Sequence, residues 1–228
     1  MSKPHEMGLA VLTGDLIGYT NWSEAKRKLA FQALQAAAAD VSAWPGADGS
    51  SHLERVRGDG WQFALTVPGF ALRAALVFRA ALRGAEAEFG APKRPLPDLD
   101  TRIAVGIGPH SHFNPSSLAG ADGPTFVRSG RELDDMAHAP NISFAANDKT
   151  SQLERMERAI VRMCDAMSRR WTGRQAAVMY VALSPEKQTG QALAQRLGIR
   201  RQSVDDHLGA AQASAIMIGL EEIERTHQ

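Results

Sequence analysis

Apolar residues change their spacing several times along the first 150 positions, and each change marks a predicted element. Short runs of β-branched, aromatic and aliphatic residues alternate with alanine-rich stretches in which apolar positions recur every three or four residues. The short runs predict strands and the longer stretches predict helices, as in a mixed α/β domain. The predicted strands are 7–12, 53–57, 61–67, 101–107, 125–127 and 142–146, and the predicted helices are 23–43, 68–89 and 131–137.

The first six of these elements follow the order strand, helix, strand, strand, helix, strand. The second and third strands are joined by GDG at 58–60, which is a strong signal for a two-stranded hairpin. This order predicts a ferredoxin-like βαββαβ core.

Beyond residue 150 the pattern becomes helical throughout. Ser151 with Glu154, and Thr172 with Gln175, fit the capping box that starts a helix. We therefore expect an α/β (α+β) domain at 1–149 and an all-α domain at 150–228. Between the two caps, an apolar stripe is expected to face the core, with Cys164 beside it as a small buried hydrophobe. The stripe is Leu153, Met156, Ile160, Met163 and Met167.

Composition narrows the class of protein without defining a function. The chain has 228 residues, a formal net charge of +1 and 44% hydrophobic residues, which is typical of a soluble globular protein. The longest uncharged apolar stretch, 208–220, is too short to span a bilayer, and the first residues lack the pattern of a secretory leader. We expect a cytoplasmic protein without a membrane partner. Its single cysteine excludes an internal disulfide and a cysteine-based zinc site.

Two aspartates occur beside predicted turns. Asp15 follows the first strand and Asp59 lies in the hairpin, so in a ferredoxin-like sheet both carboxylates can project at one edge. Paired carboxylates suit magnesium, which prefers oxygen ligands and commonly bridges to substrate phosphates. The glycines and hydroxyls of GDLIGYT (14–20) leave backbone amides free to approach a triphosphate. The alternative is that both aspartates serve only as turn residues.

GDLIGYT and VRGDGWQFAL (56–65) resemble the two metal-binding motifs of class III nucleotide cyclases. The resemblance implies that Asp15 and Asp59 bind Mg²⁺ and that a purine nucleotide lies nearby. TRIAVGIGP resembles the next cyclase strand. GPTFVRSGREL resembles the segment with the transition-state arginine, which aligns with Arg131, or with Arg128 if the segment slides by three. The nucleotide-binding residues implied are Leu16, Gly18, Tyr19, Thr20, Arg55, Arg128 and Arg131.

The chain departs from the cyclase pattern where the base and ribose bind. Arg55 stands in place of the purine-selecting lysine, Val127 in place of an asparagine, and Gly120 in place of the purine-contacting aspartate, with Asp122 two positions away. A valine cannot orient a ribose. Binding needs phosphate and metal contacts but not transition-state positioning, so we expect nucleotide binding to persist more readily than cyclisation.

The segment TGQALAQRLGIRRQSVDDHLGA (189–210) has the spacing of a helix-turn-helix. Ala194 permits close helix contact and Gly198 supplies the turn. The alternative is a helical hairpin used only for packing or dimerisation. Asp205 and Asp206 oppose DNA binding, as does a count of 11 basic against 9 acidic residues in 150–228. We favour DNA as the partner. The shared core would be Leu193, Leu197, Ile199, Val204 and Leu208, and the DNA-binding residues Arg200, Arg201, Gln202, Ser203 and His207.

The whole arrangement resembles the SatD-like family of small bacterial proteins: GDxxG, the hairpin GDxxQ-like motif, GPxFxRxxxEL, and a helix-turn-helix after WTxRQ. The favoured hypothesis is a transcription regulator that binds a purine or cyclic nucleotide with Mg²⁺. The alternatives are an active nucleotide cyclase and a ligand-free dimerisation module. A homodimer is expected, because the cyclase resemblance implies a cleft between two subunits and helix-turn-helix proteins usually bind two half-sites.

Overall fold

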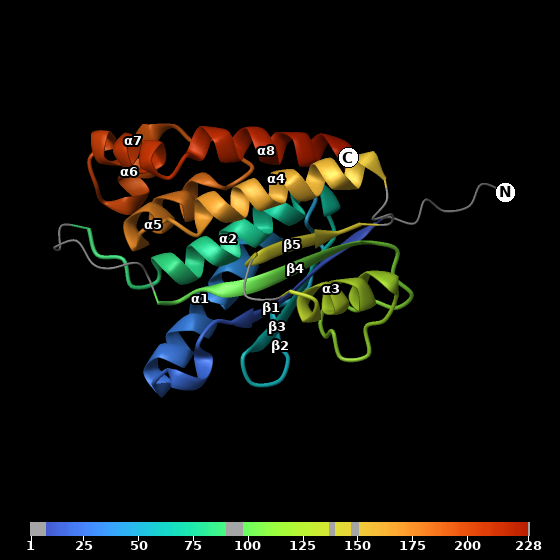
Figure 1. Cartoon of the computed structure of the whole chain (residues 1–228). Helices are drawn as coiled ribbons and strands as arrows, with labels where there is room; N and C mark the ends of the chain where they lie inside the picture. Colours follow the sequence, from blue (N-terminus) through green and yellow to red (C-terminus); the bar gives the residue numbers. More distant parts are fainter. Residues whose placement is uncertain (1–7, 90–97, 137–139, 147–150, 228) are drawn as a thin grey trace.

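The computed structural model describes residues 8–89, 98–136, 140–146 and 151–227 (Figure 1). A five-stranded sheet with the order β2-β3-β1-β4-β5 lies at its centre. β1 pairs antiparallel with β3 and β4, β2 pairs antiparallel with β3, and β5 runs parallel to β4. The first four strands and the two helices between them form the predicted ferredoxin-like core. The strands are β1 (Leu9–Leu16), β2 (Glu54–Arg55), β3 (Gly60–Leu65), β4 (Thr101–Gly108) and β5 (Ile142–Ala145).

The helices divide between the two faces of the sheet. α1 (Glu24–Ser42) and α2 (Ala71–Gly84) cover one face, and α3 (Pro124–Asp134) covers the other (Figure 1). Alternate residues of β1 pack in the layers on the two faces of the sheet, because successive side chains of a strand point to opposite faces. Leu12 packs in the α1–α2 layer, and Val11 packs against Phe126 of α3.

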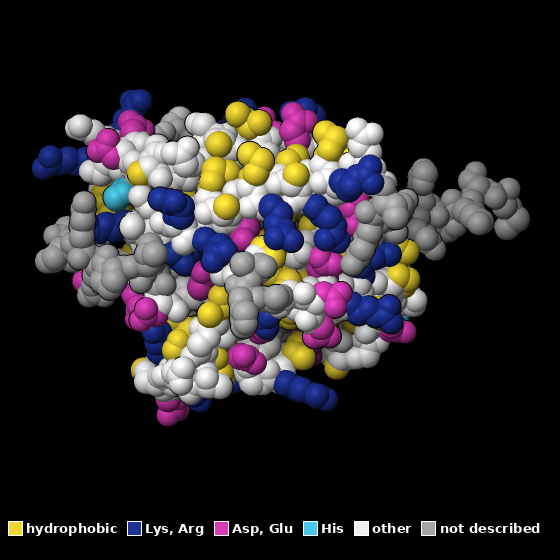
Figure 2. Space-filling view, in the orientation of Figure 1, with side chains coloured by type: hydrophobic (Ala, Val, Ile, Leu, Met, Phe, Trp, Pro, Cys, Tyr) yellow, Lys and Arg dark blue, Asp and Glu magenta, His cyan; other side chains and the backbone are white. Residues whose placement is uncertain are grey.

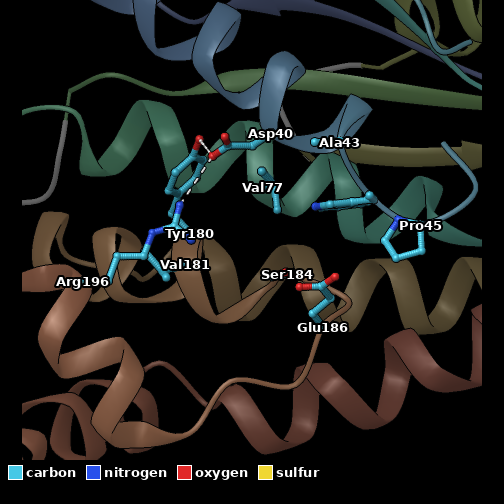
Figure 3. Close-up of a pocket in the computed structure, with 10 residues that line it drawn as sticks. Asp40, Ala43, Pro45, Val77, Tyr180, Val181, Ser184, Glu186 and Arg196 are labelled. Atoms are coloured by element: carbon cyan, nitrogen blue, oxygen red, sulfur yellow. Dashed lines mark hydrogen bonds and ion pairs between the residues drawn. The ribbon is translucent and has the colours of Figure 1, made fainter. Parts of the chain in front are cut away.

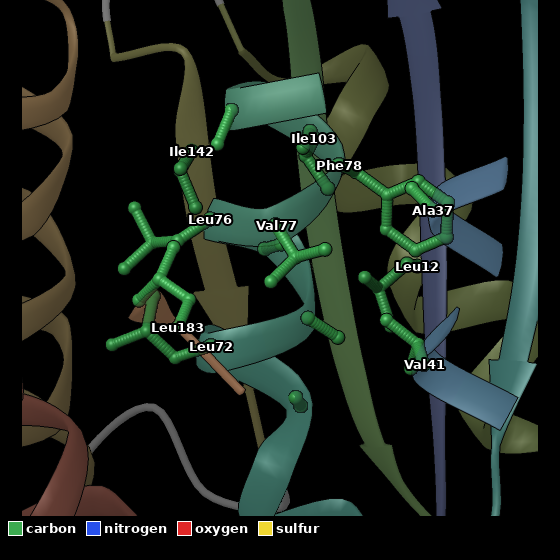
Figure 4. Packing of buried hydrophobic residues seen from close by; sticks show 14 of the residues in the cluster. Leu12, Ala37, Val41, Leu72, Leu76, Val77, Phe78, Ile103, Ile142 and Leu183 are labelled. Atoms are coloured by element: carbon green, nitrogen blue, oxygen red, sulfur yellow. The ribbon is translucent and has the colours of Figure 1, made fainter. Parts of the chain in front are cut away.

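Helices from the second half of the chain pack on the outer side of α2. α2 is therefore buried almost all round rather than along the single predicted face. Its side chains fill the space between the sheet residue Ile142 and Leu183 beyond it (Figure 4). One hydrophobic core thus extends across the predicted boundary at 149/150. These outer helices are α4 (Gln152–Ser168), α5 (Gly173–Ala182), α6 (Gly190–Leu197), α7 (Arg201–Ala210) and α8 (Ala213–Thr226).

A buried ionic network joins α2 to the second half. The Arg79 side chain is 0% exposed; its Nε and Nη2 donate to Asp100 at 3.0 and 3.1 Å, and its Nη1 donates to Asp165 of α4 at 2.6 Å. Arg83 donates to Asp100 at 2.8 Å and to the carbonyl of Trp171 at 2.7 Å. Each charge therefore has a hydrogen-bonded partner, which is the condition for tolerating it inside a protein.

Some predicted elements differ from the structure. The strand predicted at 125–127 and the helix predicted at 131–137 are one helix, α3, because Pro124 at its first position favours helix initiation over the β-branched run that follows. The first strand extends to Leu16, so Asp15 lies within β1 and not after it. Met7 and Ala137, at the ends of two predicted elements, lie outside the described residues.

The core stripe predicted for α4 is confirmed only in part. Ile160 and Met167 pack against the core, but Leu153, Met156 and Met163 are exposed. Glu154, Glu157 and Asp165 are buried instead. Cys164 is buried as predicted, and burial raises the pKa of its thiol to about 12. Both predicted helix starts are confirmed: Ser151 accepts from the Glu154 amide, and Thr172 with Gln175 forms a complete capping box.

We predict that Arg79→Met lowers the free energy of unfolding by about 3–5 kcal/mol, because Asp165 loses its ionic partner inside the core. Urea denaturation followed by circular dichroism measures this change. The control is Arg225→Met, which removes an exposed ion pair with Glu222 and should cost less than about 1 kcal/mol. Equal effects of the two substitutions would show that the buried network does not hold the two halves together.

Candidate functional site

Asp15 lies at the end of β1, between the two strands that flank it. Its register partners are Gly60 of β3 and Arg102 of β4. The Arg102 guanidinium donates through Nε to Asp15 Oδ1 at 2.9 Å and through Nη2 to Oδ2. Its third nitrogen, Nη1, donates to the carbonyl of Met136 just beyond α3, at 2.8 Å. A half-buried, two-pronged ion pair therefore holds both oxygens of the Asp15 carboxylate.

Asp59 is the neighbour of Asp15 that the sequence predicted. It lies in the turn before β3, and its backbone carbonyl accepts from the amide of Leu16 at 3.2 Å. The hydrogen bond from Arg102 to Asp15 raises the pKa of the Arg102 guanidinium, and the charges of Asp15, Asp59 and Asp134 raise it further against the effect of burial. The structure thus surrounds one arginine with three carboxylates.

Arg102 occupies the place beside Asp15 that a magnesium ion would take. Both Asp15 oxygens are engaged by Arg102, so a cation would have to displace the guanidinium. Across the parts of the chain that the structure describes, no three His, Cys, Asp or Glu side chains are grouped so as to hold a metal ion. The positive charge beside Asp15 and Asp59 belongs to Arg102.

The loop after β1 presents backbone donors. Gly18 adopts a left-handed conformation (φ 78°, ψ 10°) and leads into a 3-10 turn, η1 (Tyr19–Asn21). Within the described residues, the amides of Gly18, Tyr19 and Thr20 donate to no backbone acceptor. Successive free amides in such a turn form a concavity that binds anions.

Two arginines border this loop. Arg55 of β2 donates through Nη2 to the Tyr19 hydroxyl at 2.6 Å, and its guanidinium lies 4.3 Å from the ring centroid of Phe31. Arg27 of α1 stacks on the Tyr19 ring at 4.6 Å and donates to the carbonyls of Tyr19 and Thr20. Among the described residues, the Nη1 atom of neither arginine has a hydrogen-bond partner, so both can still meet a ligand.

Sequence reasoning placed Tyr19, Thr20 and Arg55 at this site but missed Arg27, Phe31 and Arg102. Arg27 and Phe31 are four residues apart on the helix that follows the loop, so they share one face, and that spacing could have indicated them. Arg102 could have been found only from its register opposite Asp15.

Of the two arginines predicted from the GPTFVRSGREL segment, Arg128 does not join this site within one chain. Arg128 donates to the carbonyl of Ile107, five residues along β4 from Arg102 and therefore about 16 Å away. Arg131 is exposed on α3, as is Val127. Gly120 has a positive φ in the loop before α3, and Asp122 bridges to His112 in that loop.

The segment predicted as a helix-turn-helix folds as two helices joined by a turn. α6 begins at the Thr189 cap and ends at Gly198, whose left-handed φ of 66° turns the chain into α7. Leu193, Ala194 and Val204 are buried. Leu197, Ile199 and Leu208 pack against them.

The start of α7 is open to solvent. Arg200, Arg201 and Gln202 are exposed and Ser203 is half-buried. The ring of His207, a predicted DNA-binding residue, packs against Phe89 at 5.8 Å between centroids. Burial, with the nearby charge of Arg174, lowers the pKa of His207.

An open pocket of about 180 Å³ lies where α1 meets α5 and α6 (Figure 3). The Tyr180 hydroxyl donates to Asp40 at 2.6 Å, and Arg196 of α6 lies 3.9 Å from the same carboxylate. Burial, and next the bond to Asp40, raise the pKa of Tyr180. These polar groups engage one another, so the pocket marks a contact between the ferredoxin-like part and the helix-turn-helix.

No protein-family model and no curated protein sequence matches the chain. Among solved structures, the catalytic core of a rhodopsin-guanylyl cyclase with converted specificity in complex with ATPαS is 14% identical, with a TM-score of 0.42 over 61% of this chain and 78% of that one. A bacterial light-regulated adenylyl cyclase is 17% identical, with a TM-score of 0.43 over 73% and 81%. A further structure of a bacterial light-regulated adenylyl cyclase is 17% identical, with a TM-score of 0.41 over 64% and 44%.

The fold assignment rests on the strand order and connections of the chain itself. Membership of the SatD-like family stays a prediction. Among the described residues, no helix has the length and apolar character needed to cross a membrane.

Gly14 of the GDLIGYT motif is required by a close approach of neighbouring atoms. A Cβ at this position would lie 2.5 Å from the Trp61 ring and 2.7 Å from the carbonyl of Arg102. We predict that Gly14→Ala lowers the free energy of unfolding by about 2–3 kcal/mol, since the buried ring and the backbone must shift.

The matched control is Gly130→Ala in α3, where a Cβ meets nothing within 4 Å. That substitution should stabilise the protein by about 0.5–1 kcal/mol, because alanine favours a helix interior. Thermal and urea denaturation of both variants measure the effects. A neutral Gly14→Ala would contradict the close packing described at the end of β1.

Proposed function

We propose that this protein is a nucleotide-responsive transcription regulator. Its ferredoxin-like part binds a purine nucleotide or a cyclic nucleotide, and its helix-turn-helix binds DNA. The observation that carries the proposal is the loop of free amides at Gly18–Thr20, bordered by Arg27 and Arg55. A nucleotide phosphate would receive hydrogen bonds from the amides and charge-assisted bonds from the arginines.

The contacts that hold the arginines favour this role. Arg27 and Arg55 are fixed by stacking on Tyr19 and Phe31 and by hydrogen bonds, so little conformational freedom is lost when an anion binds. Asp15 is already neutralised by Arg102, so it adds less repulsion against a phosphate than a lone carboxylate would.

In this proposal, Mg²⁺ competes with Arg102 for the carboxylate of Asp15. Asp15 and Asp59 carry the oxygen ligands that Mg²⁺ prefers, and they remain its proposed ligands. Binding at Asp15 requires release of the guanidinium. We therefore expect metal to modulate nucleotide binding more than to create it.

We predict that Arg55→Gln weakens nucleotide binding at least about tenfold, because glutamine keeps polar reach but lacks the charge that meets a phosphate. Calorimetric titration with ATP, GTP and cyclic nucleotides, each with Mg²⁺ and with EDTA, measures the affinity. Arg57→Gln is the control, since Arg57 is an exposed arginine on the same hairpin.

Asp59→Asn should remove only the component that depends on Mg²⁺. Unchanged affinity in Arg55→Gln would place the nucleotide elsewhere, and no binding by the wild-type protein would favour a ligand-free module. Formation of a cyclic product from ATP or GTP would show that the protein is an active cyclase and would contradict the proposed regulator.

Burial of acidic residues supports the DNA part of the proposal. Of the nine acidic residues in 150–228, Glu154, Glu157 and Asp165 are buried, and Glu224 is paired with the buried Arg73 at 2.6 Å. The arginines of this half are mostly exposed. The outer surface is therefore more basic than the sequence count indicates, as phosphate attraction requires.

The residues at the start of α7 have different proposed roles. Arg200, Arg201 and Gln202 are exposed where a recognition helix meets base edges, and arginine and glutamine match guanine and adenine. Asp205 pairs with Arg201 at 3.7 Å in the free protein, and both are well exposed. His207, packed on Phe89, orients the helix and does not face the DNA in this proposal.

α1 offers a route between the two sites. It begins next to the loop that would bind nucleotide, and Asp40 near its other end contacts Tyr180 and Arg196. A shift of α1 on nucleotide binding would reach α6 through these contacts.

We predict that Arg201→Ala weakens specific DNA binding by about 1–3 kcal/mol, as expected for loss of a base contact. The DNA is a sequence enriched by the wild-type protein from a random pool, and binding is measured by fluorescence anisotropy. Arg57→Gln again serves as control. Saturating nucleotide should change the wild-type DNA affinity, and DNA should change nucleotide affinity by the same factor. Identical isotherms with and without nucleotide would leave two uncoupled sites.

A further inference from the structure

α4 turns its apolar residues toward solvent. Leu153, Met156 and Met163 are 53, 57 and 64% exposed, and Ile218 of the adjacent α8 is 63% exposed. Figure 2 shows hydrophobic side chains gathered over these two helices. We call Leu153, Met156, Met163 and Ile218 the outer patch. A contiguous apolar patch framed by charged residues marks an interaction surface.

Contacts of the charged side chains on the buried side of α4 fix the orientation of this helix, so the outer patch faces solvent. Asp165 is bound to Arg79 of α2, Glu157 faces His227 at 2.8 Å, and Arg158 is bound to Glu132 of α3 at 3.0 Å. Rotating α4 to bury the apolar stripe would break all three contacts. The exposed stripe is therefore built into the fold.

α4 and α8 lie side by side and antiparallel. A Cβ on Gly219 would lie 2.9 Å from Ile160 and 3.4 Å from Cys164, whereas His227, eight residues later, contacts Glu157. Residue numbers therefore increase along α8 in the direction in which they decrease along α4. This register places Glu221 and Glu222 level with positions 159–160 of α4.

Opposite charges line the two long edges of the patch. A seven-residue spacing puts Arg155, Arg162 and Arg169 in one row, on the side of α4 away from α8. On the α8 side Glu221 and Glu222 are exposed, and Glu222 is paired with Arg225 at 3.0 Å. By the register above, the glutamates stand halfway between Arg155 and Arg162 along the helices.

We propose that the outer patch binds a second copy of this chain through a two-fold axis parallel to α4 and α8. This axis lays α4 of one protomer over α8 of its partner, so that the arginine edge meets the partner's glutamates. The four helices then form a bundle in which neighbours are antiparallel. A two-fold axis across the helices would instead place arginines against arginines.

The size of this face suits a dimer. α4 is about 25 Å long, and two helices about 9 Å apart present a projected face of roughly 500 Å². The accessible area of such a ridged surface is larger and approaches the ~800 Å² that each partner of a standard complex buries.

The axis also positions the helix-turn-helix segments. α5, α6 and α7 lie between the end of α4 and the start of α8, so each protomer carries its segment at the same end of the bundle. Two recognition helices side by side can meet two half-sites. This consequence rests on the proposed function, whereas the dimer itself does not.

Sedimentation velocity of the full chain without nucleotide or DNA tests the interface. Met163→Glu and Ile218→Glu should each raise the dimer dissociation constant by about a hundredfold, because each buries an unpaired carboxylate among apolar side chains. Val127→Glu, which alters an exposed apolar residue on α3, is the matched control and should leave the dimer intact. Circular dichroism of each variant shows that the fold is kept.

Charge reversal tests the axis. Arg162→Glu should weaken the dimer about tenfold, and adding Glu221→Arg should restore it, since the two residues face each other across the interface. A monomeric wild-type protein, or a dimer lost in Val127→Glu and kept in Met163→Glu, would overturn the proposal. So would failure of the double reversal to restore affinity. A dimer that passes these tests but binds no DNA would refute the regulator and leave the interface standing.

Discussion

The rest of the structure depends on the ion pairs that the buried guanidinium of Arg79 forms. It fixes Asp100 at the start of β4 and Asp165 in α4 at the same time. The backbone carbonyl of Asp100 in turn accepts from the amide of Ile17 at 3.0 Å, immediately before the loop of free amides. One cation therefore positions the candidate nucleotide loop and the first helix of the second half. Removing either acid would leave a charge in the core, so the two halves are bound to a single arrangement.

The same network sets which side of α4 faces outward. Apolar periodicity usually identifies the buried side of a helix, since burial of that side is the main source of helix stability in proteins. In α4, Asp165 is bound to Arg79 of α2, and Glu157 faces His227 at the end of α8. Keeping these contacts outweighs the burial of Leu153, Met156 and Met163, and the chain is left with a surface that a partner can cover.

Sequence patterns predicted the features that depend on local spacing. The βαββαβ order, the turn at Gly198 and the helix starts at Ser151 and Thr172 follow from periodicity, glycine conformation and capping, and the structure has all of them. The patterns failed where partners are distant in sequence. Arg102 meets Asp15 across 87 positions and Arg79 meets Asp165 across 86. Nothing near either residue indicates such a pairing. The sequence therefore could not predict that Asp15 is held by Arg102 or that the ionic contact of Asp165 orients α4.

Arg79 and Arg102 both neutralise acids, and their surroundings decide what each can do. Arg79 is sealed from water, so its partners cannot exchange it for another cation or for solvent without a large penalty. Arg102 neutralises Asp15 with 32% of its side chain exposed, near Asp59 and Asp134. Solvent screens and competes for this second pair, so its net contribution to stability is smaller. The first pairing therefore acts as a fixed structural contact, whereas the second is an ionic contact at the candidate site that a ligand with its own charges could replace.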